Sequence, residues 1–198
     1  MTMAAPLDAF GLADPRPQKR EQVTPNSATG PARVQAAYAA LEAVMDPEIP
    51  VINLRELGVL RDVALQGDTL HITITPTYAG CPAMAQMRED IEAALHNQGL
   101  SPFAVRTVLS PAWTTDWMSA STHDKLRAYG IAPPAHLSTE SANTAQPIRW
   151  HSKPQTTPAC PQCASPLTTL IAQSGSTACK ALYRCVQCSE PFDYFKPY

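Results

Sequence analysis

Cys160-Pro161-Gln162-Cys163 and Cys185-Val186-Gln187-Cys188 are two C-x-x-C motifs separated by twenty-one residues. Two cysteines with this spacing can present both sulfurs from one tight turn, and two facing turns supply the tetrahedral set of thiolates that Zn²⁺ prefers in structural sites. The pattern therefore indicates a four-cysteine zinc site. Disulfides, or redox-active C-x-x-C pairs, are the alternative interpretation.

The residues between the two motifs favour a zinc ribbon. Residues 167–171 and 181–184 are rich in apolar and β-branched side chains, and Gly175 with neighbouring serines and threonines lies between them. Such runs predict two short strands joined by a turn. We expect the two cysteine pairs to be held at one end of this small sheet.

Composition limits the class of protein. The chain has 198 residues, of which 44% are hydrophobic, so it can form one ordinary domain and a small appendage. No apolar run reaches the length of a membrane span and the first residues lack a secretory signal, so we expect a cytoplasmic protein. A net charge of −2 and a pI near 6.2 argue against nucleic acid as a partner.

Proline-rich polar segments divide the chain. Residues 1–30 contain several of the twenty prolines and almost no apolar periodicity, which predicts a disordered leader. Residues 132–158 have a similar composition and predict a linker. The expected organisation is thus a leader, a central domain over 31–131, the linker, and a zinc ribbon over 159–198.

The central domain should begin with a helix followed by a hairpin. Apolar residues recur at helical spacing from Gly30-Pro31 until Asp46-Pro47. Two strands over 59–65 and 70–75 are separated by a Gly-containing turn, and the second alternates apolar and polar residues. This alternation indicates a sheet with one buried and one solvated face.

A second helix should run from Pro82 to Gly99, a third strand over 103–109, and a last helix over 116–129. Because a helix links the second and third strands, these strands can lie parallel through a right-handed crossover. The fold class expected is α/β in the broad sense (α+β): a small two-layer mixed sheet covered by helices, with a separate C-terminal zinc ribbon.

The loop from Asp46 to Leu54 carries two carboxylates, Asp46 and Glu48, on a path that two prolines restrict. Carboxylates at a helix C-terminus face the negative end of the helix dipole, which is electrostatically unfavourable. Their presence there is consistent with a functional role. Equally, Asp-Pro is a common helix stop and Glu48 can simply be solvated. The residues alone leave both interpretations open.

Cys81 stands directly before the second expected helix, in Tyr78-Ala79-Gly80-Cys81-Pro82. Free N–H groups and the positive helix end should stabilise a thiolate there and lower its pKa, which makes sulfur a better nucleophile or metal ligand. An inert cysteine packed under the helix is the alternative.

Trp113 and Trp117 lie four residues apart after the third expected strand. They predict an apolar shelf near the strand ends. Core packing, a partner surface and a wall beside Cys81 all remain open for them.

Four motifs carry a resemblance to a known family: residues 46–54, 57–59, 78–82 and 110–118. Together they resemble the SufT-type family associated with iron–sulfur cluster assembly. With the C-terminal ribbon that ends in residues 191–196, the chain resembles the PaaD family of phenylacetate-degradation proteins. Both modules occur in the expected order.

The resemblance implies an accessory or maturation role beside phenylacetyl-CoA epoxidase, whose oxygenase and reductase subunits would be the partners. It implies that the protein is not itself the enzyme. Cys81 becomes the favoured reactive residue, with Asp46 and Glu48 as neighbours, for transient iron or an iron–sulfur cluster. The ribbon would hold structural zinc through Cys160, Cys163, Cys185 and Cys188.

Three functional classes follow: a maturation factor, a scaffold or adaptor of the oxygenase without metal transfer, and a stand-alone enzyme with Cys81 as nucleophile. The third needs a base, and no histidine stands in a recognisable nucleophile motif. The five are His71, His96, His123, His136 and His151. The sequence leaves a homo-oligomer, and any role of Cys179, open.

Overall fold

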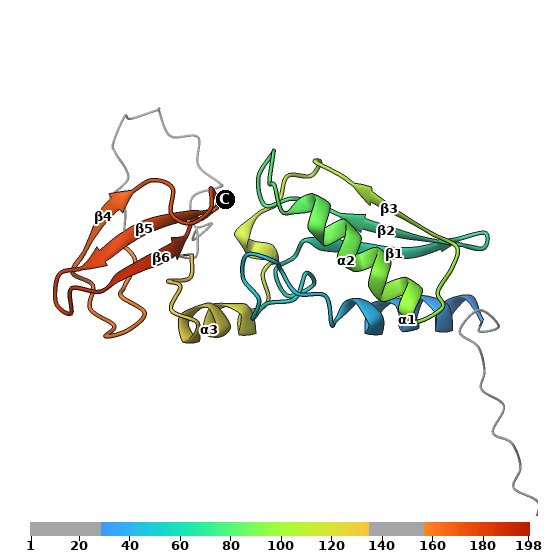
Figure 1. The fold of residues 1–198 in the computed structure, drawn as a ribbon, viewed down its shortest axis with the longest axis horizontal. Helices are drawn as coiled ribbons and strands as arrows, with labels where there is room; N and C mark the ends of the chain where they lie inside the picture. Colours follow the sequence, from blue (N-terminus) through green and yellow to red (C-terminus); the bar gives the residue numbers. More distant parts are fainter. Residues whose placement is uncertain (1–28, 135–156) are drawn as a thin grey trace, which may run out of the picture.

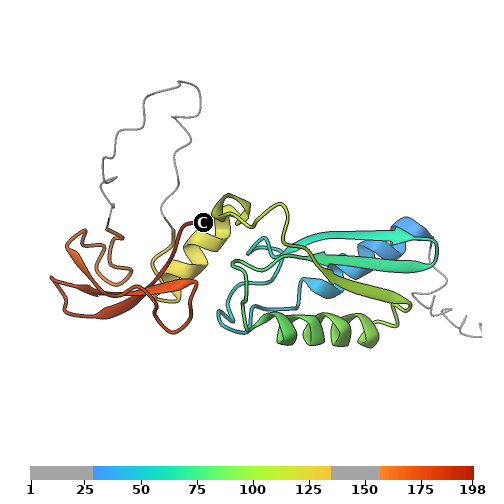
Figure 2. The same cartoon turned by 90° about the horizontal axis from the view of Figure 1, so that it is seen from above.

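The computed structural model describes residues 29–134 and 157–198 (Figure 1). The expected leader lies almost entirely outside the described residues, and so does most of the expected linker. The described part contains an α+β body and a C-terminal ribbon with a sheet of its own, as the fold class predicts (Figure 2). None of the described helices is long and apolar enough to cross a membrane.

Helix α1 (Gly30–Leu41) begins with proline in its first turn, where the missing N–H costs nothing. Ala37, Leu41 and the following Val44 are buried, at helical spacing. The helix ends earlier than the predicted stop at Asp46, because the chain turns after Leu41 so that Met45 pairs with Asn53 across the loop.

The sheet of the body has three strands. Strand β1 (Leu60–Gln66) pairs antiparallel with β2 (Thr69–Ile74), and β2 pairs parallel with β3 (Phe103–Thr107), which confirms the predicted hairpin and the parallel pairing. The alternating Leu70, Ile72 and Ile74 are fully buried.

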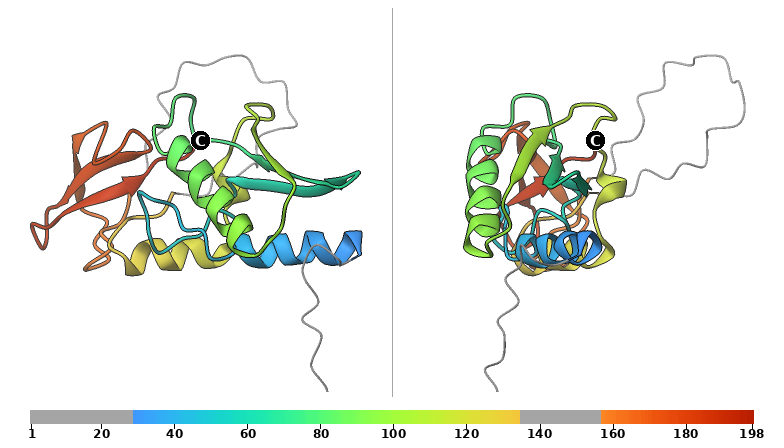
Figure 3. Two further views of the ribbon diagram at one scale, coloured as in Figure 1. Left: turned by 45° about the vertical axis from the view of Figure 1, so that its right-hand side comes forward. Right: turned by 90° about the vertical axis from the view of Figure 1, so that its right-hand side faces the viewer.

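Helix α2 (Met84–Asn97) connects β2 to β3 and begins two residues later than predicted. It contacts α1 and β3, and its buried residues Met87, Ile91 and Leu95 recur at helical spacing. The two helices form one layer and the sheet the other (Figure 3).

After β3, a 3₁₀ turn (Thr115–Trp117) precedes helix α3 (Ala120–Ala128), so the single last helix predicted over 116–129 is divided. Here Gly58 has φ +78°, and a Cβ on it would lie 2.8 Å from Trp117. The loop before β1 and the turn at Trp117 can approach this closely only because residue 58 has no side chain.

The ribbon contains strands β4 (Thr168–Ala172), β5 (Lys180–Cys185) and β6 (Pro191–Phe195), antiparallel in that order. The first two confirm the predicted strands, and β6 was not predicted. The core of the ribbon includes Tyr183, whose ring stacks on Phe192 at 6.0 Å between centroids and meets Tyr194 edge-on at 5.6 Å.

The ribbon is joined to the body through β6. Ala132, which follows α3, donates its N–H to the Asp193 carbonyl at 2.8 Å and accepts from the Phe195 N–H at 2.9 Å. The Phe195 ring leaves the ribbon and belongs to the core of the body, where it lies 5.9 Å from the Trp113 ring. The end of the chain follows, with the Tyr198 carbonyl accepting from the Thr115 N–H.

Phe195→Ala should loosen this junction, because it removes a ring that is only 1% exposed, and a Phe→Ala change in a core costs about 3–5 kcal/mol. Cys179, 4% exposed at the junction, should then react several-fold faster with iodoacetamide under native conditions, measured by mass spectrometry of its peptide.

Phe192→Ala is the matched control, since it also removes a phenylalanine ring, but from the core of the ribbon itself. It should speed the loss of zinc to a chelator, which Phe195→Ala should not. Unchanged Cys179 alkylation in Phe195→Ala would contradict the junction described here.

Candidate metal centre and thiol loop

The two C-x-x-C motifs face each other at one end of the ribbon. The Sγ atoms of Cys160 and Cys188 lie 3.7 Å apart and those of Cys163 and Cys185 lie 3.5 Å apart. All four ligand atoms lie within 4.8 Å of one another. All six cysteines lie in the described residues and each is a free thiol, so the disulfide alternative has no support.

Each motif is followed by a residue of left-handed conformation: Ala164 has φ 58° and Ser189 has φ 65°. These residues come directly after Cys163 and Cys188, so the chain reverses just after the second sulfur of each pair. The Cys188 N–H points at the Cys185 sulfur, at 3.5 Å. Each turn thus has a left-handed residue at the same position, in keeping with the identical C-x-x-C spacing of the two motifs.

Because the four sulfurs lie close together, the pKa values of neighbouring cysteines shift in opposite directions. The N–H of Cys188 stabilises the Cys185 thiolate and lowers its pKa to about 6. For Cys188, the N–H of Glu190 lowers the pKa, but burial and hydrogen bonding with the three neighbouring cysteines together outweigh it and raise the pKa to about 12. Four adjacent thiols cannot all ionise by themselves, and a divalent cation among them would allow it.

The group fits zinc. In a tetrahedral site with Zn–S bonds of about 2.3 Å, sulfurs lie about 3.8 Å apart, close to the two distances observed here. Four protein sulfurs leave no position for water or substrate, which is typical of a structural zinc. The residues that would hold it are Cys160, Cys163, Cys185 and Cys188.

Asp46 shapes the loop after α1. It is 4% exposed, and its Oδ1 accepts the backbone N–H groups of Glu48 and Ile49, each at 2.8 Å. Burial raises the pKa of this carboxyl, although the two N–H groups lower it. Asp46 therefore fixes the turn that presents Glu48, a more specific structural role than the helix stop that the sequence left open.

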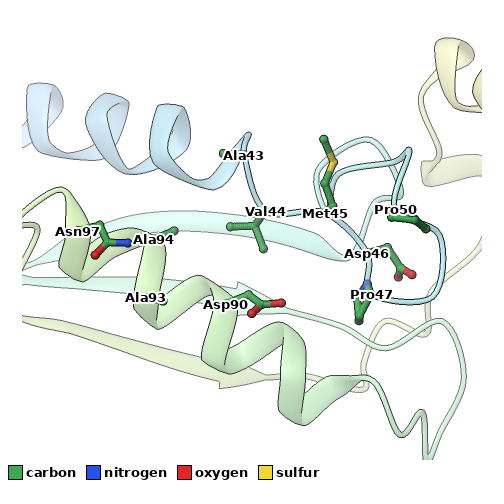
Figure 4. A pocket seen from close by; sticks show the side chains of 10 residues that line it. All are labelled: Ala43, Val44, Met45, Asp46, Pro47, Pro50, Asp90, Ala93, Ala94 and Asn97. Carbon is green, nitrogen blue, oxygen red and sulfur yellow. The ribbon is translucent and has the colours of Figure 1, made fainter.

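A hollow of about 410 Å³ lies between this loop and α2 (Figure 4). Asp46, Pro47 and Pro50 line it from the loop, and Asp90 and Asn97 from the helix. The Asp90 carboxylate already accepts a hydrogen bond from Gln86 at 2.8 Å, and the Asp46 carboxylate is used by its own turn. Because its carboxylates have partners within the chain, we assign this hollow no ligand.

Cys81 lies in the turn before α2, with its N–H donated to the Tyr78 carbonyl at 3.3 Å. The side chain is half-buried and packs against the core of the body. Burial raises the pKa of the thiol, and the carboxylates of Glu48 and Asp46 raise it further, while the N–H of Ala83 lowers it. The predicted lowering of this pKa was wrong, because burial and nearby negative charge outweigh the helix end.

The two tryptophans have different roles. Trp113 is buried and donates its indole N–H to the Leu57 carbonyl at 3.1 Å, in contact with the ribbon through Phe195. Trp117 is half-buried, with the Arg61 guanidinium 3.4 Å from its ring centroid. Trp113 is thus a core residue that also receives the ribbon.

Sequence reasoning missed one neighbour of Glu48. The Cys179 thiol, from the turn before β5, donates to Glu48 Oε2 at 3.7 Å. Nothing in the local pattern connects positions 48 and 179, since only the docking of the ribbon brings them together. The raised pKa of Cys179, about 11, results first from burial and also from the Glu48 charge.

Asp46→Ala should lower the free energy of unfolding by about 1–3 kcal/mol, because two backbone N–H groups lose their acceptor. Asp46→Asn keeps an oxygen at that position and should lose less. Chemical denaturation of the two variants checks this. Equal losses would contradict the structural role of Asp46.

Cys185→Ser should remove zinc and unfold the ribbon, because metal binding supplies most of the folding free energy of such small modules. Metal analysis should give one zinc per chain for the unaltered protein and almost none for the variant. Cys179→Ser, whose sulfur lies outside the group, should keep its zinc. Zinc loss in that control instead would mean that the ligand set is misassigned.

Two family models match successive parts of the chain. Residues 34–109 match the family described as "Iron-sulfur cluster assembly protein", and residues 144–196 match "PaaD zinc beta ribbon domain". A solved structure, "Crystal Structure of Domain of Unknown Function DUF59 from Bacillus anthracis", is 32% identical. It has a TM-score of 0.46 and covers 49% of this chain and 93% of its own.

Two curated relatives are similar in sequence. The "Fe-S protein maturation auxiliary factor YitW" of Bacillus subtilis (strain 168) is 39% identical over 82 residues, which is 40% of this chain and 79% of the relative. A protein of Escherichia coli (strain K12), named as a putative subunit of 1,2-phenylacetyl-CoA epoxidase, is 46% identical over 166 residues, 84% of this chain and 94% of the relative. The chain belongs to the PaaD family of phenylacetyl-CoA epoxidase subunits, which joins an iron–sulfur assembly domain to a zinc ribbon.

Proposed function

We propose that this protein assists the insertion of iron or an iron–sulfur cluster into the oxygenase or reductase subunits of a phenylacetyl-CoA epoxidase, as an accessory subunit without catalytic activity of its own. The name of the Escherichia coli relative supports the epoxidase, and the name of the Bacillus subtilis relative supports maturation. The iron–sulfur assembly family covers the part of the chain that contains Cys81.

The observation that carries this proposal is the contrast between two thiol environments. Four sulfurs of the ribbon form a closed set, whereas Cys81 is half-buried beside the charges of Glu48 and Asp46 and remains partly open to solvent. A carrier must release its cargo, so an incomplete ligand set suits delivery better than a closed one. Iron is here a cargo, and zinc a resident ion.

Cys81 and Glu48 would both take part in binding iron. On binding, the Cys81 thiol gives up its proton and its sulfur becomes a ligand. The nearby carboxylate of Glu48 can take that proton or offer oxygen to the metal. Asp46 holds the turn in which Glu48 stands, so its contribution is positioning.

The electrostatics of Cys81 argue against the stand-alone enzyme. A nucleophilic cysteine is activated by a neighbouring cation or by a base that removes its proton. Around Cys81 the acting charges are the carboxylates of Glu48 and Asp46, which raise the pKa of the thiol. Such a thiol is protonated at neutral pH and becomes a ligand when a cation replaces its proton.

The ribbon offers a surface for a client subunit. Leu167 and Val186 are 62% and 63% exposed, and the Val186 N–H is donated to the Leu167 carbonyl, so the two residues lie side by side next to the zinc group. Ile171, on β4, is 48% exposed. Adjacent exposed apolar side chains such as Leu167 and Val186 can form part of a protein contact.

Cys81→Ser should leave zinc content and fold intact but reduce several-fold the iron bound by oxygenase and reductase subunits that are co-expressed with it. The reason is that a serine oxygen is a poor substitute for a thiolate toward iron. Iron and sulfide analysis of the purified subunits measures this.

Ala79→Ser is the matched control, since it places a hydroxyl on an exposed position of the same loop without removing the thiol. It should support full iron occupancy. Full occupancy with Cys81→Ser as well would exclude metal transfer through Cys81 and leave the scaffold as the function.

A further inference from the structure

Cys179 belongs to the ribbon by sequence but packs with the body. It lies outside the core of the ribbon and outside the zinc group, and among the described residues it joins Phe195 as a ribbon residue in the buried cluster of the body. Only 4% of it is exposed. A thiol that the zinc group does not use is thereby held at the junction of the two modules.

The surroundings of Cys179 are polar on one side. Its Sγ lies 3.7 Å from Glu48 Oε2 and 3.0 Å from Thr177 Oγ1. The following Lys180 is turned toward Asp193, with Nζ 3.6 Å from Oδ2, so this buried ammonium has a partner within the ribbon. The carboxylate that meets the sulfur of Cys179 is therefore Glu48, from the other module.

Cys81 and Cys179 share neighbours. The charges of Glu48 and Asp46 act on both thiols. Both thiols and Glu48 also act on the hydroxyl of Tyr78, three residues before Cys81. Three separate segments thus bring two sulfurs and two carboxylates close to the loop that contains Tyr78.

An unpartnered hydroxyl lies at the start of the loop that leads to Cys81. Thr75 is 1% exposed, and its Oγ1 has no hydrogen-bond partner among the described residues. With Thr77 and Tyr78 it lines a crevice of about 290 Å³ that Trp113 and Tyr198 also line. Buried hydroxyls are nearly always hydrogen-bonded, so this crevice has room for a polar group, although Cys81, Glu48 and Cys179 do not line it.

We propose that Cys179 is a second cargo ligand: together with Cys81 and Glu48 it forms, at the junction between body and ribbon, a site for a thiophilic divalent cation such as Fe²⁺, alone or within a cluster. This rests on the function proposed for Cys81 and adds the ribbon as a contributor of ligands. The ribbon then does more than bind a client, because it completes the site that holds the cargo.

The site is looser than the zinc group. Among the described residues, the four ribbon cysteines are the one group of three or more such side chains whose ligand atoms lie within 4.8 Å of one another. The junction groups must therefore draw together on a metal. When they do, two S–H bonds are replaced by two S–metal bonds, the two protons pass to solvent, the Glu48 carboxylate coordinates in its ionised form, and no electron is transferred.

Cobalt titration tests this with the full-length protein. Zinc first fills the ribbon, and Co²⁺ does not displace it because zinc binds more tightly in the usual order of divalent metals. Added Co²⁺ should then produce the near-ultraviolet absorbance of cobalt bound to thiolate. Cys179→Ser and Cys81→Ser should each weaken Co²⁺ binding at least about tenfold, as the loss of a ligand or its support does.

Ala181→Ser is the control, since it alters a small buried residue two positions further along, in β5, and should bind Co²⁺ like the unaltered protein. Zinc analysis and circular dichroism establish that each variant is folded. Unaltered binding in Cys179→Ser, with binding lost in Cys81→Ser, would overturn this inference and leave the proposed function standing. Unaltered Co²⁺ binding in both Cys179→Ser and Cys81→Ser would overturn this inference and the proposed function together. If the unaltered protein gives no cobalt–thiolate absorbance, the junction site is excluded.

Discussion

Ala132 exchanges two backbone hydrogen bonds with the outer edge of β6, and the arrangement of the two modules depends on this contact. The ribbon is small, and a zinc ion in its four-cysteine group, together with a few aromatic rings, would account for its own stability. Once β6 is paired with Ala132, Phe195 enters the core of the body beside Trp113. The same docking carries Cys179 to Glu48. The ribbon is thus a structural part of the proposed junction site, as well as an appendage with its own sheet.

The two proposed metal sites of this chain differ in their chemistry. In the ribbon, four sulfurs at 3.5–3.7 Å within each facing pair would exclude further ligands, as in a structural zinc site. At the junction, burial and carboxylates raise the pKa values of Cys81 and Cys179, so each thiol keeps its proton until a cation replaces it. On the function proposed above, such thiols would bind a metal more weakly than the ribbon group, and weak binding would favour transfer to a client.

Local patterns predicted the elements well, and tertiary contacts account for what they missed. The alternation of residues 70–75 and the C-x-x-C spacing each lie within a short segment, so β2 and the convergence of the four sulfurs could be anticipated. The role of Asp46 required knowledge that its side chain turns back onto the N–H groups of Glu48 and Ile49. The raised pKa of Cys81 and the proximity of Cys179 depend on burial and on the docked ribbon, which no local pattern contains.

Amide hydrogen exchange at Ala132 and Phe195 tests the docked arrangement most directly, because both N–H groups are donated across the junction. If the ribbon is docked, these two amides should be protected to the same degree as those that pair β5 with β6 inside the ribbon. Exchange of both at the rate of an unstructured chain, while the β5–β6 amides stay protected, would show that the ribbon moves independently and would remove the basis for a shared thiol site.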